Sequence, residues 1–173
     1  MIKKTILMAL ILIFGVLCFF YGKSIDKLDV KEGYYAMQGY SFKIPEGWQE
    51  TNELGPIAFL NVSENNGDNP FKSYVFLISE ELKGRSPKQY FDYIKAKVKE
   101  SSENVEILEE KDEGSFHIII AKVFENENEY IIAMALRKGV SDTYFVVSLN
   151  SLESNWETTK PIFEETYRSF KLR

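Results

Sequence analysis

A run of 17 residues at positions 5–21 carries no charge and is almost wholly apolar, so it does not suit the surface of a small globular domain. Lys3 and Lys4 precede the run, and a polar segment follows it. As a helix the run would span roughly 25 Å, which is near the lower limit for a bilayer core of about 30 Å. Basic residues before an apolar run are typical of a signal whose amino terminus stays in the cytoplasm. The sequence therefore predicts residues 1–22 as a signal anchor or signal peptide, with the remaining chain outside the cytoplasm.

Two details of this segment bear on its processing. Gly22 and Ser24 are the small residues of a signal-peptidase site, but Lys23 stands between them. Cys18 would be the acylated residue of a lipoprotein, yet Leu17 occupies the position where a small residue is required. We favour a single-pass membrane anchor that is retained, with Cys18 as an apolar filler; a secreted domain with a cleaved leader is the alternative.

The remaining 151 residues suit one domain and carry 19 basic and 26 acidic side chains, a formal charge of −7. This charge argues against a nucleic-acid partner, which requires a concentrated basic surface. The sequence has no glycine-rich motif that would hold phosphates, so we expect no nucleotide. One histidine and one cysteine, the latter in the anchor, leave no ligand set for zinc. We therefore expect no cofactor and no metal.

The predicted organisation is an anchor at 1–22, a tether at 23–39 and a globular domain at 40–173. The tether includes a short candidate strand at 34–37. In the domain, apolar patterning predicts seven strands and two helices. The strands are expected at 40–44, 57–62, 74–78, 105–108, 116–124, 130–136 and 143–149.

The first helix is predicted to begin at Ser86, which can cap it, with Pro87 at its first position and Gln89 closing a capping box. The second is expected to begin near Thr158, which places Pro161 among the first four residues, where no helical N–H partner is required.

Four consecutive strands joined by short polar turns indicate an antiparallel meander. The strand at 74–78 is apolar at every position, and the strands at 116–124 and 130–136 contain apolar runs, so both faces of the sheet require cover. The predicted fold class is α+β: a largely antiparallel sheet of about seven strands with one helix on each face, an α/β/α sandwich.

Residues 40–48, with the sequence YSFKIPEGW, and residues 169–171, with the sequence SFK, resemble the PsbP-like fold family. The helix after the third strand and the KPIF sequence at 160–163 also match. The family includes the extrinsic photosystem II protein PsbP, a nuclear Ran-release factor and small exported bacterial proteins. The resemblance implies an α/β/α sandwich over about 40–173 and non-enzymatic work as an assembly factor, accessory subunit or chaperone. Photosystem and Ran binding are not implied here, because the anchor and the compartment differ.

Candidate catalytic residues are few. His117 could form a triad with Ser115 and Asp112, but Ser115 and His117 point to the same face of a strand and no nucleophile elbow precedes them. We interpret His117 as a packed or partly exposed strand residue.

Two turns rich in acidic or amide side chains are candidate calcium sites. In an EF-hand frame the loop at 65–69 would place Val62 and Ser73 at ligand positions, so the frame fails. Glu125, Glu127 and Glu129 lie on a hairpin turn that we interpret as solvated, with weak calcium binding outside the cell as the alternative.

Aromatic residues offer a candidate binding patch. Tyr34, Tyr35 and Tyr40 near the tether could form an exposed surface for a partner, although packing in the core or at a strand edge is the favoured interpretation.

The sequence thus predicts a membrane-tethered, extracytoplasmic, non-catalytic protein that binds a protein partner at or near the membrane. Its binding residues are not identified by the sequence, beyond the expectation of a sheet edge or a helix-free part of a sheet face. Two alternatives stay open: a hydrolase of envelope components with a carboxylate site, and an immunity-type protein that binds one toxin.

Overall fold

The computed structural model describes residues 33–37, 39–54, 57–100, 102, 104–125, 127–140 and 142–173. The predicted anchor at 1–22 lies outside these residues. Among the residues described, no helix combines the length and the apolar character needed to cross a bilayer.

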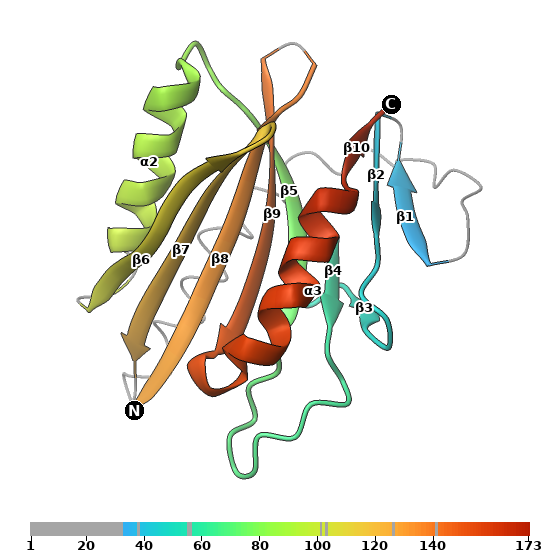
Figure 1. Cartoon of the computed structure of the whole chain (residues 1–173), viewed down its shortest axis with the longest axis vertical. Coiled ribbons are helices and arrows are strands. Elements are labelled where there is room, and N and C mark those ends of the chain that lie inside the picture. Colours follow the sequence, from blue (N-terminus) through green and yellow to red (C-terminus); the bar gives the residue numbers. More distant parts are fainter. Residues whose placement is uncertain are drawn as a thin grey trace.

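The centre of the fold is a seven-stranded antiparallel sheet with the order β3-β4-β5-β9-β8-β7-β6 (Figure 1). Its strands are β3 (Gln49–Thr51), β4 (Ala58–Leu60), β5 (Tyr74–Glu81), β6 (Val105–Glu113), β7 (Phe116–Glu125), β8 (Asn128–Lys138) and β9 (Thr143–Leu152). Strands β6 to β9 form the predicted meander, because each is joined to the next by a short polar turn. A register shift between Ile107 and Glu109 bends the edge strand β6.

A second sheet of three short strands lies beside α3, with the order β1-β2-β10. Its strands are β1 (Tyr34–Met37), β2 (Tyr40–Lys43) and β10 (Lys171–Leu172). The candidate strand at 34–37 is therefore confirmed, and its residues Tyr35, Ala36 and Met37 are buried. Gly33, the first described residue, already takes part in the fold, because its carbonyl accepts a hydrogen bond from the N–H of Ile44.

Two helices are described, and they lie on opposite faces of the large sheet. Helix α2 (Pro87–Glu100) packs on one face through Tyr90, Ile94 and Val98. Helix α3 (Trp156–Ser169), which follows a 3₁₀ turn at Glu153–Asn155, packs on the other face together with the small sheet. The predicted capping box is confirmed, since Gln89 N–H donates to Ser86 Oγ and Ser86 N–H donates to Gln89 Oε1.

The core on the α3 face is rich in aromatic rings that join the two sheets. Phe42 of β2 contacts Phe59 of β4 with ring centroids 5.9 Å apart, and Phe170 lies 5.2 Å from Phe145 of β9. Tyr167 packs edge-on against Phe116 of β7 at 5.2 Å. This aromatic layer holds the carboxy-terminal helix and the small sheet against the large one.

Two sequence predictions were wrong in detail. The strand at 40–44 was expected in the seven-stranded sheet, but it forms β2 of the small sheet, and the three-residue β3 takes the edge position instead. The turn at Pro45 explains this: Trp48 N–H donates to the Pro45 carbonyl, and Gly47 has φ +77°, so the chain leaves one sheet for the other here.

The second difference concerns α3, which begins at Trp156 rather than near Thr158 and holds Pro161 at its sixth position. Proline has no N–H, so the carbonyl of Glu157 loses its helical donor. Earlier in the helix, hydroxyl groups add their own bonds, because Thr158 and Thr159 both donate to the carbonyl of Asn155. The helix therefore begins before the proline without a side-chain cap at Asn155.

Candidate functional site

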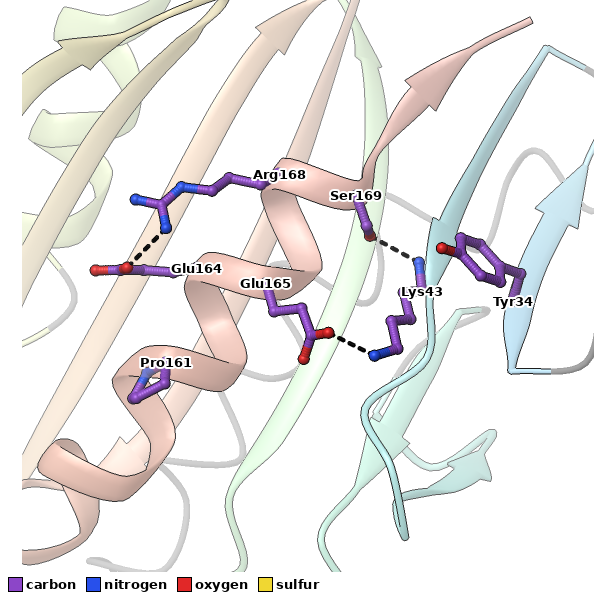
Figure 2. Close-up of a pocket in the computed structure, with 7 residues that line it drawn as sticks. All are labelled: Tyr34, Lys43, Pro161, Glu164, Glu165, Arg168 and Ser169. Carbon is purple, nitrogen blue, oxygen red and sulfur yellow. Dashed lines mark hydrogen bonds and ion pairs between the residues drawn. The ribbon is translucent and has the colours of Figure 1, made fainter.

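A shallow groove with a volume of about 820 Å³ lies between α3 and the small sheet (Figure 2). The proline inside α3 lies at one end of the groove, and strands β1 and β2 form the other side. The groove is lined by Tyr34, Lys43, Pro161, Glu164, Glu165, Arg168 and Ser169.

The charged groups of this groove are paired with one another. Lys43 Nζ lies 2.5 Å from Glu165 Oε1, and the Lys43 backbone N–H donates to Ser169 Oγ at 2.8 Å. Arg168 bridges two carboxylates, with Nη1 2.9 Å from Glu164 and Nε 2.8 Å from Glu113. Each ionised group therefore already has a partner of opposite charge.

The pKa directions agree with a structural network. The hydrogen bond to Glu165 raises the pKa of Lys43, which stays protonated. Arg168 lowers the pKa of Glu113, with a further contribution from the Tyr167 hydroxyl. These shifts favour the ionised forms, whereas a general acid or base requires a pKa near the working pH. The groove is thus an ion-pair network that joins α3 to β2 and β6.

His117 occupies a second cluster, on the α2 face. Its ring stacks on Phe91 with centroids 4.1 Å apart and an interplanar angle of 5°. Nδ1 lies 2.8 Å from Asp112, and Nε2 lies 3.3 Å from Glu110 without a hydrogen bond. Within the described part of the chain no hydroxyl is hydrogen-bonded to Nε2, so these residues do not form the triad with Ser115. The side chain is only 12% exposed, in line with the packed interpretation.

The tyrosines near the tether divide between core and surface. Tyr35 and Tyr40 are buried, with exposures of 5% and 8%, and both belong to the α3-side core. Tyr34 is partly exposed and lines the groove. The favoured interpretation as packed residues is therefore confirmed for Tyr35 and Tyr40.

The asparagine-rich loop between β4 and β5 is organised by a carboxylate. Glu64 accepts hydrogen bonds from the backbone and hydroxyl of Ser73, and from the side chains of Asn66 and Asn155. These donors occupy the carboxylate and tie the loop to the turn before α3. Among the described residues, no group of three or more acidic, histidine or cysteine side chains is arranged to hold a metal ion.

The α2 face of the large sheet is covered unevenly. Helix α2 packs on β6 and β7, and Tyr90 reaches Glu80 at the end of β5 with a hydrogen bond of 2.9 Å. The other end of this face carries apolar side chains that are all partly exposed. We call this set the open face; it consists of Phe71, Tyr74, Phe76, Tyr130 and Ile132.

The open face is built as two apolar rows with a polar row between them. Tyr74 and Phe76 belong to β5, and Tyr130 and Ile132 belong to β8. Strand β9 runs between them and places two buried polar residues there: Ser148, 1% exposed, beside Phe76, and Asn150, 9% exposed, beside both Tyr74 and Ile132.

Phe71, from the loop before β5, closes one end of the open face. Its ring centroid lies 5.1 Å from that of Tyr130 and 6.0 Å from that of Tyr74. Of the two described helices, α2 is displaced toward β6 and α3 lies on the opposite face (Figure 1).

Sequence reasoning did not find the open face. The apolar run at 74–78 predicted a strand covered on both faces. Val75 and Leu77 are buried on the α3 side and Ile78 is buried on the α2 side, whereas Tyr74 and Phe76 stay partly exposed on the α2 side. Tyr74 and Phe76, two residues apart, both lie on the α2 face of β5. Whether they are buried depends on how much of that face α2 covers, which the local sequence does not specify.

The arrangement of sheets and helices defines a PsbP-like α/β/α sandwich. Three solved structures share this fold. The first is the Ran-binding protein Mog1p of Saccharomyces cerevisiae, with a TM-score of 0.57, 16% identity and coverage of 86% of this chain and 96% of that one.

The second is cyanobacterial PsbP (CyanoP) of Synechocystis sp. PCC 6803, with a TM-score of 0.53, 17% identity and coverage of 90% and 97%. The third is LpqN of Mycobacterium tuberculosis, which is involved in cell envelope biogenesis, with a TM-score of 0.57, 10% identity and coverage of 91% and 96%. No protein-family model and no curated protein matches the sequence. At these identities the likeness establishes the fold, and the resemblance seen in the sequence is confirmed at that level.

Proposed function

We propose that this protein is a membrane-tethered accessory protein whose domain lies outside the cytoplasm and binds a protein partner without catalysing a reaction. The observation that carries the proposal is the open face, a partly exposed aromatic surface on an otherwise well-packed sheet. Aromatic side chains are enriched in the cores of protein interfaces, and tyrosine is among the residue types that contribute most binding energy there.

The charged clusters support binding over catalysis. In the groove, Lys43, Arg168 and their carboxylate partners neutralise one another, and around His117 the polar atoms belong to a stacked, largely buried ring. A hydrolase would require a nucleophile or a carboxylate pair that converges on a cleft. The open face has no acidic or basic side chain among its five members.

The proposed location outside the cytoplasm is supported by the apolar segment at 5–21 and by the proteins that share this fold. Residues 5–21 approach the length of a membrane span, and Lys3 and Lys4 favour a cytoplasmic amino terminus. Among proteins with this fold, LpqN acts in cell envelope biogenesis and Mog1p binds Ran. An anchor raises the effective concentration of the domain at a partner in the same membrane.

The test begins with fractionation of cells that express the full chain or a variant without residues 1–22. We expect the full chain in the membrane fraction, resistant to high salt, and sensitive to protease added from the outer side. Recovery of the full chain in the cytosol would refute the tethering.

Binding is tested separately with a photo-crosslinking amino acid at Phe76, and with the same amino acid at Glu157 on α3 as the matched control. We expect one reproducible membrane-dependent product from position 76 only. Equal labelling from both positions, or none from either, would refute the open face as the binding surface.

A further inference from the structure

Strand β6 is the last strand of the large sheet, and within the described part of the chain no strand pairs with its outer edge (Figure 1). Its residues 109–113, which we call the β6 edge, follow the bulge of this strand. We propose that the β6 edge binds an extended, lysine- or arginine-rich segment of a partner protein as an additional antiparallel strand. The inference goes beyond the proposed function, because β7 separates the β6 edge from the open face and neither surface depends on the other.

The backbone of the β6 edge has hydrogen-bonding groups that the sheet does not use. A two-residue turn at 114–115 follows the strand, so Glu113 is in the pair that closes the hairpin and exchanges both of its backbone bonds with β7. Bonded pairs alternate along an antiparallel ladder, so Lys111 is also bonded to β7, whereas Glu110 and Asp112 direct their N–H and C=O groups outward. Such a row of outward groups is a template for a further strand.

The β6 edge is accessible to another chain. The first turns of α2 lie over β7 and β9, because Phe91 stacks on His117 and Tyr90 packs against a tyrosine ring of β9. A bulge within an edge obstructs pairing, but here the unpaired residue is Leu108, which precedes the β6 edge and is itself 44% exposed. The three successive residues at 110–112 are all exposed. The edge residues therefore keep a regular register and meet solvent.

Charge indicates which kind of segment fits the β6 edge. Its five residues include four acids and one lysine. The Asp112 side chain is 82% exposed, and among the described residues its ionic partner is His117. Glu110, on the same face, is paired with Lys95. Opposite charges directly across a strand pair are stabilising and like charges are destabilising. A basic segment is therefore favoured, whereas the β6 edge of a second copy would place acids against acids.

The binding test uses the full-length chain in nanodiscs of phosphatidylcholine, a lipid without net charge that does not attract a basic probe. The probe is an acetylated, dye-labelled peptide of about seven residues in which threonine and lysine alternate, the length of a short strand. One derivative carries N-methyl groups on its lysine amides, a second carries them on its threonine amides, and a third has glutamate in place of lysine. Binding is measured by fluorescence anisotropy.

The two methylated peptides distinguish strand pairing from charge attraction. An antiparallel strand whose lysines lie opposite Glu110 and Asp112 directs its lysine N–H groups to β6 and its threonine N–H groups to solvent. We therefore expect lysine methylation to weaken binding at least about tenfold and threonine methylation less than about threefold. The glutamate peptide should not bind. Equal effects of the two methylations, or no binding of the lysine peptide up to about 1 mM, would overturn the proposal.

A matched pair of charge reversals tests the protein side. Asp112→Lys should weaken binding of the lysine peptide about fivefold, whereas Asp68→Lys, the same change at an exposed loop residue, should leave it unchanged. Asp112→Asn keeps a hydrogen-bond acceptor for His117 and should weaken binding about twofold, which provides a second variant if the lysine variant does not fold. Equal losses from the two reversals would mean attraction to the acidic domain as a whole and would refute the β6 edge as the site.

Hydrogen exchange measured by NMR adds a readout that charge attraction alone does not change. When the lysine peptide binds, the N–H groups of Glu110 and Asp112 should exchange more slowly, while that of Lys111, already bonded to β7, should keep its rate. Uniform slowing of all three amides, or no slowing of any, would contradict strand addition. Crosslinking from Phe76 tests the open face independently, so failure of one surface is distinguishable from failure of the other.

Discussion

Two phenylalanines on neighbouring strands test whether the open face is a surface or part of the core. Phe59 of β4 is 1% exposed on the α3 side, where it packs against Tyr35 and Phe42. Phe76 of β5 is partly exposed on the other side. Phe59→Ala should cost about 4 kcal/mol, since it removes a buried ring and leaves a closed cavity. Phe76→Ala should cost about 1 kcal/mol, because only part of the transfer free energy of the ring is lost and no cavity closes.

The measurement is urea unfolding of a chain that starts at residue 23, monitored by the fluorescence of its two tryptophans, the buried Trp48 and the partly buried Trp156. With an m-value of about 2 kcal/mol per molar for a domain of this size, the midpoint should fall by about 2 M for Phe59→Ala and about 0.5 M for Phe76→Ala. Equal shifts would mean that Phe76 is packed as tightly as the core, and they would refute the assignment of the open face as a binding surface.

Three further perturbations probe other parts of the fold. A Cβ at Gly139 would lie 2.6 Å from the Phe145 ring, so Gly139→Ala should destabilise by about 1–3 kcal/mol and lower Tm in a calorimetric scan, unlike an alanine at an exposed turn. Pro161→Ala restores a helical N–H in α3 and should stabilise by about 2 kcal/mol; a lower urea midpoint would contradict the described helix. Arg168→Gln should raise the pKa of Glu113, which Arg168 lowers, in an NMR titration. Because that pKa is depressed in the fold, the stability advantage of the wild type should hold at neutral pH and shrink as the pH falls through the folded pKa.

The sequence predicted the elements whose signals are local. The capping residues Ser86 and Gln89 located the start of α2, and the polar turns located the hairpins of the meander. The placement of β2 in a separate sheet was not predictable in this way. Its partners β1 and β10 lie at opposite ends of the domain sequence, and a short alternating strand is equally compatible with either sheet.

The candidate site was less predictable than the fold, for a related reason. Whether Tyr74 and Phe76 are core or surface depends on how far α2 extends over the sheet, and that is decided by tertiary contacts such as Tyr90 with Tyr144 at 4.9 Å. Hydrophobic patterning identifies side chains that avoid water, but it does not identify what covers them. The ion pairs of the groove were equally unpredictable from the sequence, because Lys43 and Glu165 are 122 residues apart in it.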